Sequence, residues 1–244
     1  MKAYVSAVNW PSNVITWTGY ITKLRTCGGP LHLGIVLVDC DEAQVAAHSA
    51  EALSEPSARG KACVSFDYLS DRRPRFQGLD GDYFANARVA LYEIRSAAAE
   101  EVHRMCVHVA QARPFNDNLF KLNPLFGGCW PCSLGSAGAA YLPPSHCVAL
   151  TMRIVAAARV GSQNVMYDDR DVFCELGVPR GGLLRPFSPR VLNGFVPGGA
   201  VAAMVRFGCL RSPVHMLPTL VAAEAASAEG RLPLLLVSDA SISI

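Results

Sequence analysis

The sequence of 244 residues lacks a run of about 18 uninterrupted apolar residues, which is the length that a helix needs to span a bilayer. Residues 1–8 are apolar only briefly before Asn9 and Pro11 interrupt them, so the start of the chain does not read as a secretory signal peptide. The formal net charge is only +2, and residues of opposite charge are interspersed. Such a balance gives no basic patch of the kind that binds nucleic acid. We therefore expect no transmembrane segment and no nucleic-acid partner.

A regular cysteine framework is also missing. The nine cysteines are an odd number without repeated spacing: they lie at positions 27, 40, 63, 106, 129, 132, 147, 174 and 209. A disulfide scaffold is usually built from an even, regularly spaced set in a short secreted chain. This pattern favours a reducing, intracellular compartment.

Apolar residues are plentiful, at 51% of the chain, whereas charged residues make up 17%. This composition suits a packed core and argues against long disordered segments. We expect a single domain over residues 1–244, with its core at about 10–195 and an extension at 196–244. The basic cluster at 71–75 contains a proline and is interpreted as a solvated loop.

The segment from Leu142 to Arg159 is the most informative stretch of the chain. Its two prolines cannot continue a preceding helix, and Ser145 is predicted to cap a helix that follows. Cys147 would then lie in the first turn of that helix, where the positive end of the helix dipole stabilises a thiolate. This placement makes Cys147 a candidate nucleophile.

A candidate base for Cys147 lies far upstream, at His32. Residues 31–39 form a short apolar run rich in branched side chains and bounded by turn residues, which is typical of a strand. His32 is at the beginning of this strand. If the strand packs against the Cys147 helix, imidazole and thiol form the ion pair that cysteine hydrolases use.

Further elements are expected along the chain. Strands are predicted at 62–69 and 88–94, and helices at 42–53, 97–111, 171–176, 188–195 and 217–228. The apolar runs at 200–207 and 231–237 are interpreted as added strands, and 160–170 as a polar turn. Antiparallel strands packed on a helix that carries the cysteine make an α+β fold.

The order of these motifs resembles that of the circularly permuted papain-like (NlpC-type) superfamily of cysteine hydrolases, in which histidine precedes cysteine. Residues 32–35 resemble its "H-x-G-I" strand, and residues 145–150 its cysteine-then-helix segment. Residues 13–26 resemble the amphipathic segment before the histidine strand, and 112–118 its "G-x-P-Y-D" turn, although Ala112 and Phe115 depart from it. Gly177 and residues 187–192 resemble the "S-P-x-x-L" tail of versions from large DNA viruses. The resemblance covers residues 10–195 approximately.

The resemblance implies a permuted papain-like fold and a third catalytic residue on the strand after the histidine strand. Asp67 is the first choice for this residue, because Ser65 lies on the same face two positions earlier. Glu93 on the third strand is the alternative. Such a group would hold the imidazole in the correct tautomer. The backbone N–H of Cys147 is expected to serve the oxyanion hole.

A rival motif is the Cys-x-x-Cys pair of Cys129 and Cys132. A redox site is disfavoured because a flexible stretch, 133–138, follows the pair instead of a helix. A zinc site could add His146 and Cys147, but adjacent ligands suit tetrahedral geometry poorly. We interpret this segment as a loop, and we expect no metal and no cofactor.

The sequence thus predicts a thiol hydrolase, with peptidase or amidase activity as the first choice, that forms an acyl-cysteine on a peptide or other acyl-bearing substrate. A lipid acyltransferase or thioesterase of the same superfamily is one alternative. Others are a non-enzymatic viral structural or interaction protein that retains the fold, and a zinc-stabilised binding module. The tail resemblance points to a viral protein in the infected cell or the virion.

Overall fold

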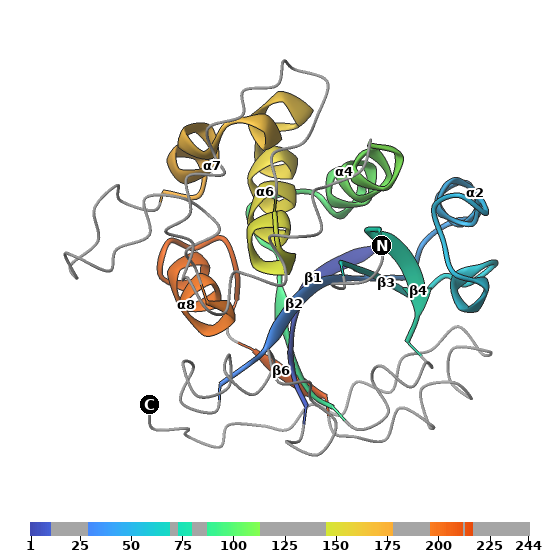
Figure 1. Cartoon of the computed structure of the whole chain (residues 1–244), viewed down its shortest axis with the longest axis horizontal. Helices are drawn as coiled ribbons and strands as arrows, with labels where there is room; N and C mark the ends of the chain where they lie inside the picture. Colours follow the sequence, from blue (N-terminus) through green and yellow to red (C-terminus); the bar gives the residue numbers. More distant parts are fainter. Residues whose placement is uncertain are drawn as a thin grey trace.

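The computed structural model describes residues 1–10, 29–68, 73–79, 87–112, 145–177, 196–211 and 213–216. Its strands and helices alternate irregularly along the chain, and helices cover an antiparallel sheet (Figure 1). The strands are β1 (Lys2–Asn9), β2 (His32–Val38), β3 (Val64–Asp67), β4 (Arg75–Gly78), β5 (Arg88–Glu93) and β6 (Val214–Met216). The helices are α2 (Glu42–His48), α4 (Ala99–Gln111), α6 (Cys147–Val160), α7 (Asp169–Glu175) and α8 (Pro197–Arg206), with short 3-10 turns η1 (Pro56–Ala58) and η3 (Gln163–Tyr167). The predicted α+β class is confirmed.

The described strands form one sheet in the order β4-β3-β2-β1-β5-β6, and every neighbouring pair is antiparallel. β1 lies in the middle, where Val8 pairs with His32 of β2 and Tyr4 pairs with Glu93 of β5. The predicted core begins near residue 10 and so does not include this strand. Its residues were considered only as a possible signal peptide, although they are buried almost throughout.

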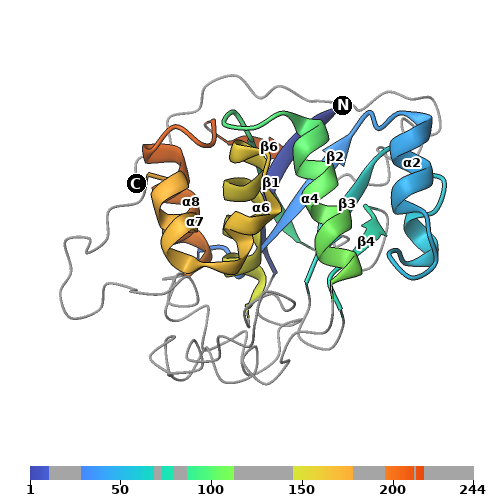
Figure 2. The same ribbon diagram turned by 90° about the horizontal axis from the view of Figure 1, so that it is seen from above.

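The sheet buries apolar side chains on both faces. On one face, Val5, Leu33 and Ile35 join a large cluster with residues of α4 and α6. Figure 2 shows the helices side by side in front of this face. On the other face, Tyr4 and Val36 belong to a separate buried cluster. Burial on both faces explains why β2 reads as a continuous apolar run instead of an alternating one.

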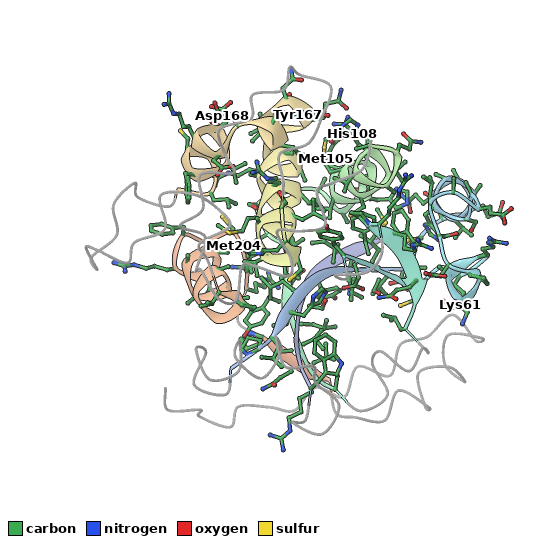
Figure 3. All side chains as sticks on the ribbon, viewed as in Figure 1. Lys61, Met105, His108, Tyr167, Asp168 and Met204 are labelled. Carbon is green, nitrogen blue, oxygen red and sulfur yellow. The ribbon has the colours of Figure 1, made fainter. Side chains whose placement is uncertain are left out.

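Helix α6 is the central helix and is buried over most of its length. It ends at Gly161, which takes the left-handed conformation (φ 71°) that closes a helix at low cost with glycine. Met105 of α4 lies in the apolar layer beside it (Figure 3). His108 of α4 also bonds to the hydroxyl of Tyr167 in η3 at 3.0 Å. Helix α4 therefore packs against α6 and is also bonded to η3, the turn that follows α6.

A buried arginine fixes the beginning of α6 to the turn beyond its end. Arg153 Nε donates to Ser145 Oγ at 3.0 Å, and Nη1 donates to the carbonyl oxygen of Met166 at 2.6 Å. Its Nη2 pairs with the carboxylate of Asp169. A buried guanidinium is stable only when paired and hydrogen-bonded in this way. The network fixes the backbone just before Cys147.

Several predicted elements differ from the structure in extent or type. The helix predicted at 42–53 ends at His48, and the predicted turn at 160–170 contains η3 and the beginning of α7. The strand predicted at 200–207 is wrong, because this run lies in α8: Ala200, Val201 and Met204 are buried at helical spacing. Arg75, predicted to lie in a solvated loop, begins strand β4.

Other predicted features lie outside the described residues. These are the segments at 13–26, 113–118, 129–132, 187–195, 217–228 and 231–237. Within the part of the chain that the structure describes, no helix has both the length and the apolar character needed to cross a membrane.

Candidate functional site

The candidate site forms where two elements begin. Cys147 is the first residue of α6, and His32 is the first residue of β2. Their side chains are hydrogen-bonded to each other and buried, with exposed fractions of 6% and 3%. The structure therefore brings together two residues that are separated by more than a hundred positions in the sequence.

The cap of α6 is His146, not the predicted Ser145. His146 Nδ1 accepts hydrogen bonds from the backbone N–H groups of Val148 at 3.2 Å and Ala149 at 3.4 Å. Ser145 instead accepts the bond from Arg153. The correction has a simple reason: a neutral imidazole nitrogen can accept from free N–H groups as a serine oxygen does, and the buried arginine competes for the serine. Cys147 still occupies the first turn, as predicted.

Asp67 lies on the opposite side of the imidazole from Cys147. His32 Nε2 is 2.9 Å from Asp67 Oδ1. The second carboxylate oxygen accepts from Ser65 Oγ at 2.5 Å and from Gln77 Nε2 at 2.7 Å. Because Nε2 is engaged by Asp67, Nδ1 is the ring nitrogen that faces the sulfur. The three residues form a chain of thiol, imidazole and carboxylate.

Glu93, the alternative third residue, is not part of this chain. It lies on β5, opposite Tyr4 of β1, and its carboxylate forms an ion pair with Arg211 at 2.9 Å. The structure therefore brings Asp67, and not Glu93, to His32.

Gly34 makes room for the carboxylate. In the β2–β3 register, Ile35 pairs with Phe66, so Gly34 stands opposite Asp67. A Cβ atom at Gly34 would lie 2.1 Å from Asp67 Oδ1 and 3.1 Å from Ser6 Oγ. No side chain fits there while the carboxylate keeps its place. Gly34 thus allows Asp67 to reach the imidazole over the backbone of β2.

The opposite charges of Cys147 and His32 stabilise each other and offset the cost of burying them. Burial by itself raises the pKa of Cys147, but His32 and His146 lower it to about 5, each through charge and through hydrogen bonding. Burial also lowers the pKa of His32, whereas the charge of Cys147 and the bond to Asp67 raise it to about 10. The stable form between these values is a thiolate and an imidazolium.

Three neighbours of the site were not predicted from the sequence. The ring of Trp10, just after β1, lies 5.8 Å from the imidazole ring of His32. Gln77 comes from β4, which has no sequence signal of its own, and the sequence indicates His146 only as a possible zinc ligand. Trp10 covers part of the imidazole with an apolar surface, and such cover strengthens the hydrogen bond beneath it.

The described residues contain no group of three or more histidine, cysteine or acidic side chains placed to hold a metal ion. Cys129 and Cys132, the proposed half of a zinc site, lie outside these residues. His146 caps α6 through Nδ1 and also lowers the pKa of Cys147. His146 and Cys147 are thus engaged with each other and with the helix.

Comparison with known proteins adds no assignment. No protein-family model matches the chain, no curated protein matches it, and no solved structure matches it.

Proposed function

We propose that the protein is a thiol hydrolase in which Cys147 is the nucleophile, His32 the general base and acid, and Asp67 the residue that orients His32. The observation that supports this most directly is the continuous hydrogen-bonded chain from the Cys147 sulfur through His32 to Asp67. An activated cysteine requires a base within reach and a third group that orients the base. All three are present, on α6, β2 and β3.

In the acylation step, the Cys147 thiolate attacks the carbonyl carbon of the substrate and forms a tetrahedral oxyanion. The C–N or C–O bond then breaks, and the His32 imidazolium gives its Nδ1 proton to the leaving group. The products are an acyl-cysteine, a neutral imidazole and the released amine or alcohol. Asp67 keeps the second ring proton on Nε2, which directs Nδ1 to the reacting atoms.

In the deacylation step, His32 takes a proton from water as the water attacks the acyl carbon. The tetrahedral intermediate collapses, the C–S bond breaks, and the thiolate leaves beside the re-formed imidazolium. The backbone N–H of Cys147 has no acceptor within α6, because it belongs to the first turn. We expect it to donate to the oxyanion in both steps.

The basicity of His32 favours amides as substrates. An amine is a poorer leaving group than a thiolate, so amide cleavage requires protonation of the leaving nitrogen. In the resting site the charge of Cys147 and the bond to Asp67 raise the pKa of His32 to about 10, so this proton is in place at neutral pH before the attack. We therefore place peptidase or amidase activity ahead of ester or thioester hydrolysis.

The proposed fold is the permuted papain-like one. The chain order, with His32 before Cys147, and the antiparallel sheet packed on a cysteine-bearing helix agree with it. The viral association predicted from 187–192 depends on residues outside the described part of the chain.

The first test uses p-nitrophenyl acetate as a probe, followed by stopped-flow absorbance and intact mass spectrometry. We expect a burst of nitrophenol, one acetyl group on the protein, and its location on Cys147. Cys147→Ala should abolish the burst. Cys174→Ser is the matched control, because Cys174 is an exposed thiol on α7, and it should leave the burst intact. A burst that survives Cys147→Ala would refute the assignment.

A second test addresses the bond type. A library of fluorogenic peptide amides is compared with the corresponding esters, using the wild-type chain and Cys147→Ala. Cysteine-dependent cleavage of amides is the expected result. Cleavage of esters alone would replace amide hydrolysis with the esterase alternative.

A further inference from the structure

We propose that Gln77 is a positioning residue of the site: its side-chain amide holds one carboxyl oxygen of Asp67 and thereby keeps the other oxygen on Nε2 of His32. The inference rests on the proposed function and deepens it, because it adds a residue that acts on His32 through Asp67. Gln77 Nε2 donates to Asp67 Oδ2 at 2.7 Å, and Asp67 Oδ1 lies 2.9 Å from His32 Nε2. Strand β4 thus contributes to a chain of residues that otherwise comes from α6, β2 and β3.

The pairing of β3 with β4 brings Gln77 within reach of Asp67. Ser65 and Gln77 are direct cross-strand partners, so their side chains lie on the same face of the sheet. Asp67 follows on that face two residues after Ser65 and is therefore the diagonal neighbour of Gln77. Diagonal neighbours in an antiparallel pair lie about 7–8 Å apart, a separation that a long side chain can bridge. Glutamine has the required length, whereas asparagine is shorter by one methylene group.

Two donors hold the same oxygen of Asp67. An accepting oxygen requires the NH₂ end of the Gln77 amide, because the other end of an amide has no hydrogen to donate. Ser65 Oγ donates to this oxygen as well, at 2.5 Å. Rotation of the carboxyl group about its Cβ–Cγ bond would break both bonds, one from its own strand and one from β4. Oδ1 is thus held against His32 Nε2, which leaves Nδ1 of the ring for the sulfur.

Strand β4 is itself bonded on the side away from β3. The backbone N–H of Phe76 donates to the carbonyl oxygen of Leu53 at 2.9 Å, and the N–H of Gly78 donates to Ser57 Oγ at 3.0 Å. These bonds flank Gln77 along the strand. The amide therefore extends from a strand that is fixed on both sides, and a positioning residue requires such rigid support.

The first test removes the donor with Gln77→Met, which keeps a side chain of similar length and volume. The readout is the Nε2 proton of His32, observed by NMR with isotope-labelled histidine and assigned by its loss in His32→Gln. A ring proton bonded to a carboxyl oxygen resonates downfield and exchanges slowly with water. In Gln77→Met we expect an upfield shift and exchange about 10-fold faster, the factor expected for loss of a hydrogen bond to a charged group. An unchanged resonance would refute the role of Gln77.

Ser57→Ala is the matched control, since it weakens the same strand without changing the amide. It removes the acceptor of Gly78 N–H, so it should lower Tm and leave the His32 resonance unchanged. If Ser57→Ala and Gln77→Met shift the resonance equally, Gln77 acts only by supporting β4, and the proposal is wrong.

Two further measurements apply if Gln77→Met does not fold. Gln77→Asn retains an amide that is too short for the diagonal contact, and it should change the His32 resonance as the methionine variant does. In the wild-type protein, the side-chain amide protons of Gln77 should exchange with water more slowly than those of Gln163, an exposed glutamine. Equal exchange rates for the two glutamines would overturn the inference.

A kinetic readout separates this inference from the proposed function. The burst rate constant of Gln77→Met with p-nitrophenyl acetate should fall about 10-fold at saturation with an unchanged dependence on probe concentration, because the amide acts on the base and not on the probe. The expected change of the resonance without any burst in the wild-type protein would overturn the proposed function alone. A normal burst and an unchanged resonance in Gln77→Met would overturn the role of Gln77 alone.

Discussion

Two buried clusters of the protein each contain histidine, and they shift the histidine pKa in opposite directions. In the first, His32 lies between Cys147 and Asp67, and its pKa is raised to about 10. In the second, His48 Nδ1 is 3.2 Å from His103 Nε2, which joins α2 to α4. Burial lowers the pKa of His48, and burial together with the charge of His48 lowers that of His103 to about 4.

Burial therefore lowers the histidine pKa in both clusters. The neighbouring groups determine whether the net shift is up or down. His32 faces groups that can be negative. His48 faces the carbonyl oxygen of Lys61 at 3.0 Å, the apolar ring of Phe76 and a second imidazole. Carbonyl dipoles and an aromatic ring do not offset the loss of hydration of a cation, and a second imidazolium would repel it. The cluster of His32 thus stabilises a charged imidazole, and the cluster of His48 and His103 stabilises neutral ones.

The largest effect should come from His32→Gln, which removes the positive partner of Cys147 and leaves the sulfur buried. We expect the alkylation midpoint of Cys147 to rise by about 3 pH units or more, toward the value of an ordinary thiol. The proposed acyl transfer should be lost as well. Iodoacetamide alkylation between pH 4 and 10 measures the change. If the midpoint stays near that of the wild type, His32 is not what stabilises the thiolate.

Gly34→Ala should have the next largest effect, because the new methyl group overlaps Asp67 Oδ1. Displacing a group that orients a base by about 1 Å can cost about 100-fold in rate, which is the loss we expect in the burst. Overpacking should also lower the free energy of unfolding by about 1–3 kcal/mol. Gly199→Ala is the control: it lies in α8 with only ordinary contact, and it should not slow the burst. Equal rates in both variants would argue against a role for Asp67.

The His48–His103 cluster should make the protein sensitive to acid. Both histidines bind a proton more weakly in the folded protein than in the unfolded chain, where histidine titrates near 6.5. The unfolded state then takes up more protons as the pH falls from about 6.5 toward 4, so stability is complete above this window and decreases within it. Urea unfolding at several pH values measures the slope.

His103→Gln is the variant that tests the source of this slope. Glutamine keeps a polar partner for His48 but does not titrate, so the decrease in stability between about pH 6.5 and 4 should become shallower. The Cys147–His32 pair also contributes to the wild-type slope above about pH 5, and it is unchanged in the variant. Identical slopes for the two proteins would show that the second cluster does not govern acid sensitivity.

The smallest effect should come from Ser6→Ala, beside the first cluster. Ser6 Oγ is buried and has no hydrogen-bond partner among the described residues, although it lies near Gly34. Removing a buried hydroxyl that makes no bond should leave Tm unchanged or raise it by up to about 3 °C. Differential scanning calorimetry measures this. A marked fall in Tm would mean that the hydroxyl belongs to the network around Asp67.

The parts of the site that were predictable have local signals. Cys147 begins an apolar helix after a break, and His32 begins an apolar strand, so each could be identified from its own segment. Asp67 was chosen over Glu93 because of its expected strand and its alternation with Ser65. In the structure it contacts His32, whereas Glu93 pairs with Arg211.

What was missed depends on contacts between distant segments. Nothing near Gln77 indicates that it will donate to a carboxylate ten residues earlier, because that contact requires the β3–β4 pairing. The cap was assigned to Ser145 since no local rule shows that Arg153 will take its hydroxyl. Strand β1 was overlooked because its partners lie about 30 and 85 residues away. Local propensity determines which segments form helices and strands. Tertiary pairing determines which side chains come into contact.

The central position of β1 has a consequence for the order in which the protein is made. β1 is synthesised before β2 and β5. It can pair with β5 only after Glu93, the partner of Tyr4, has been made. The His32–Asp67 pair can therefore form on the nascent chain before Cys147 exists. At about 5–20 residues per second, the thiol arrives several seconds later. We therefore expect a ribosome-bound chain that stops before α6 to be able to pair His32 with Asp67 in the absence of Cys147.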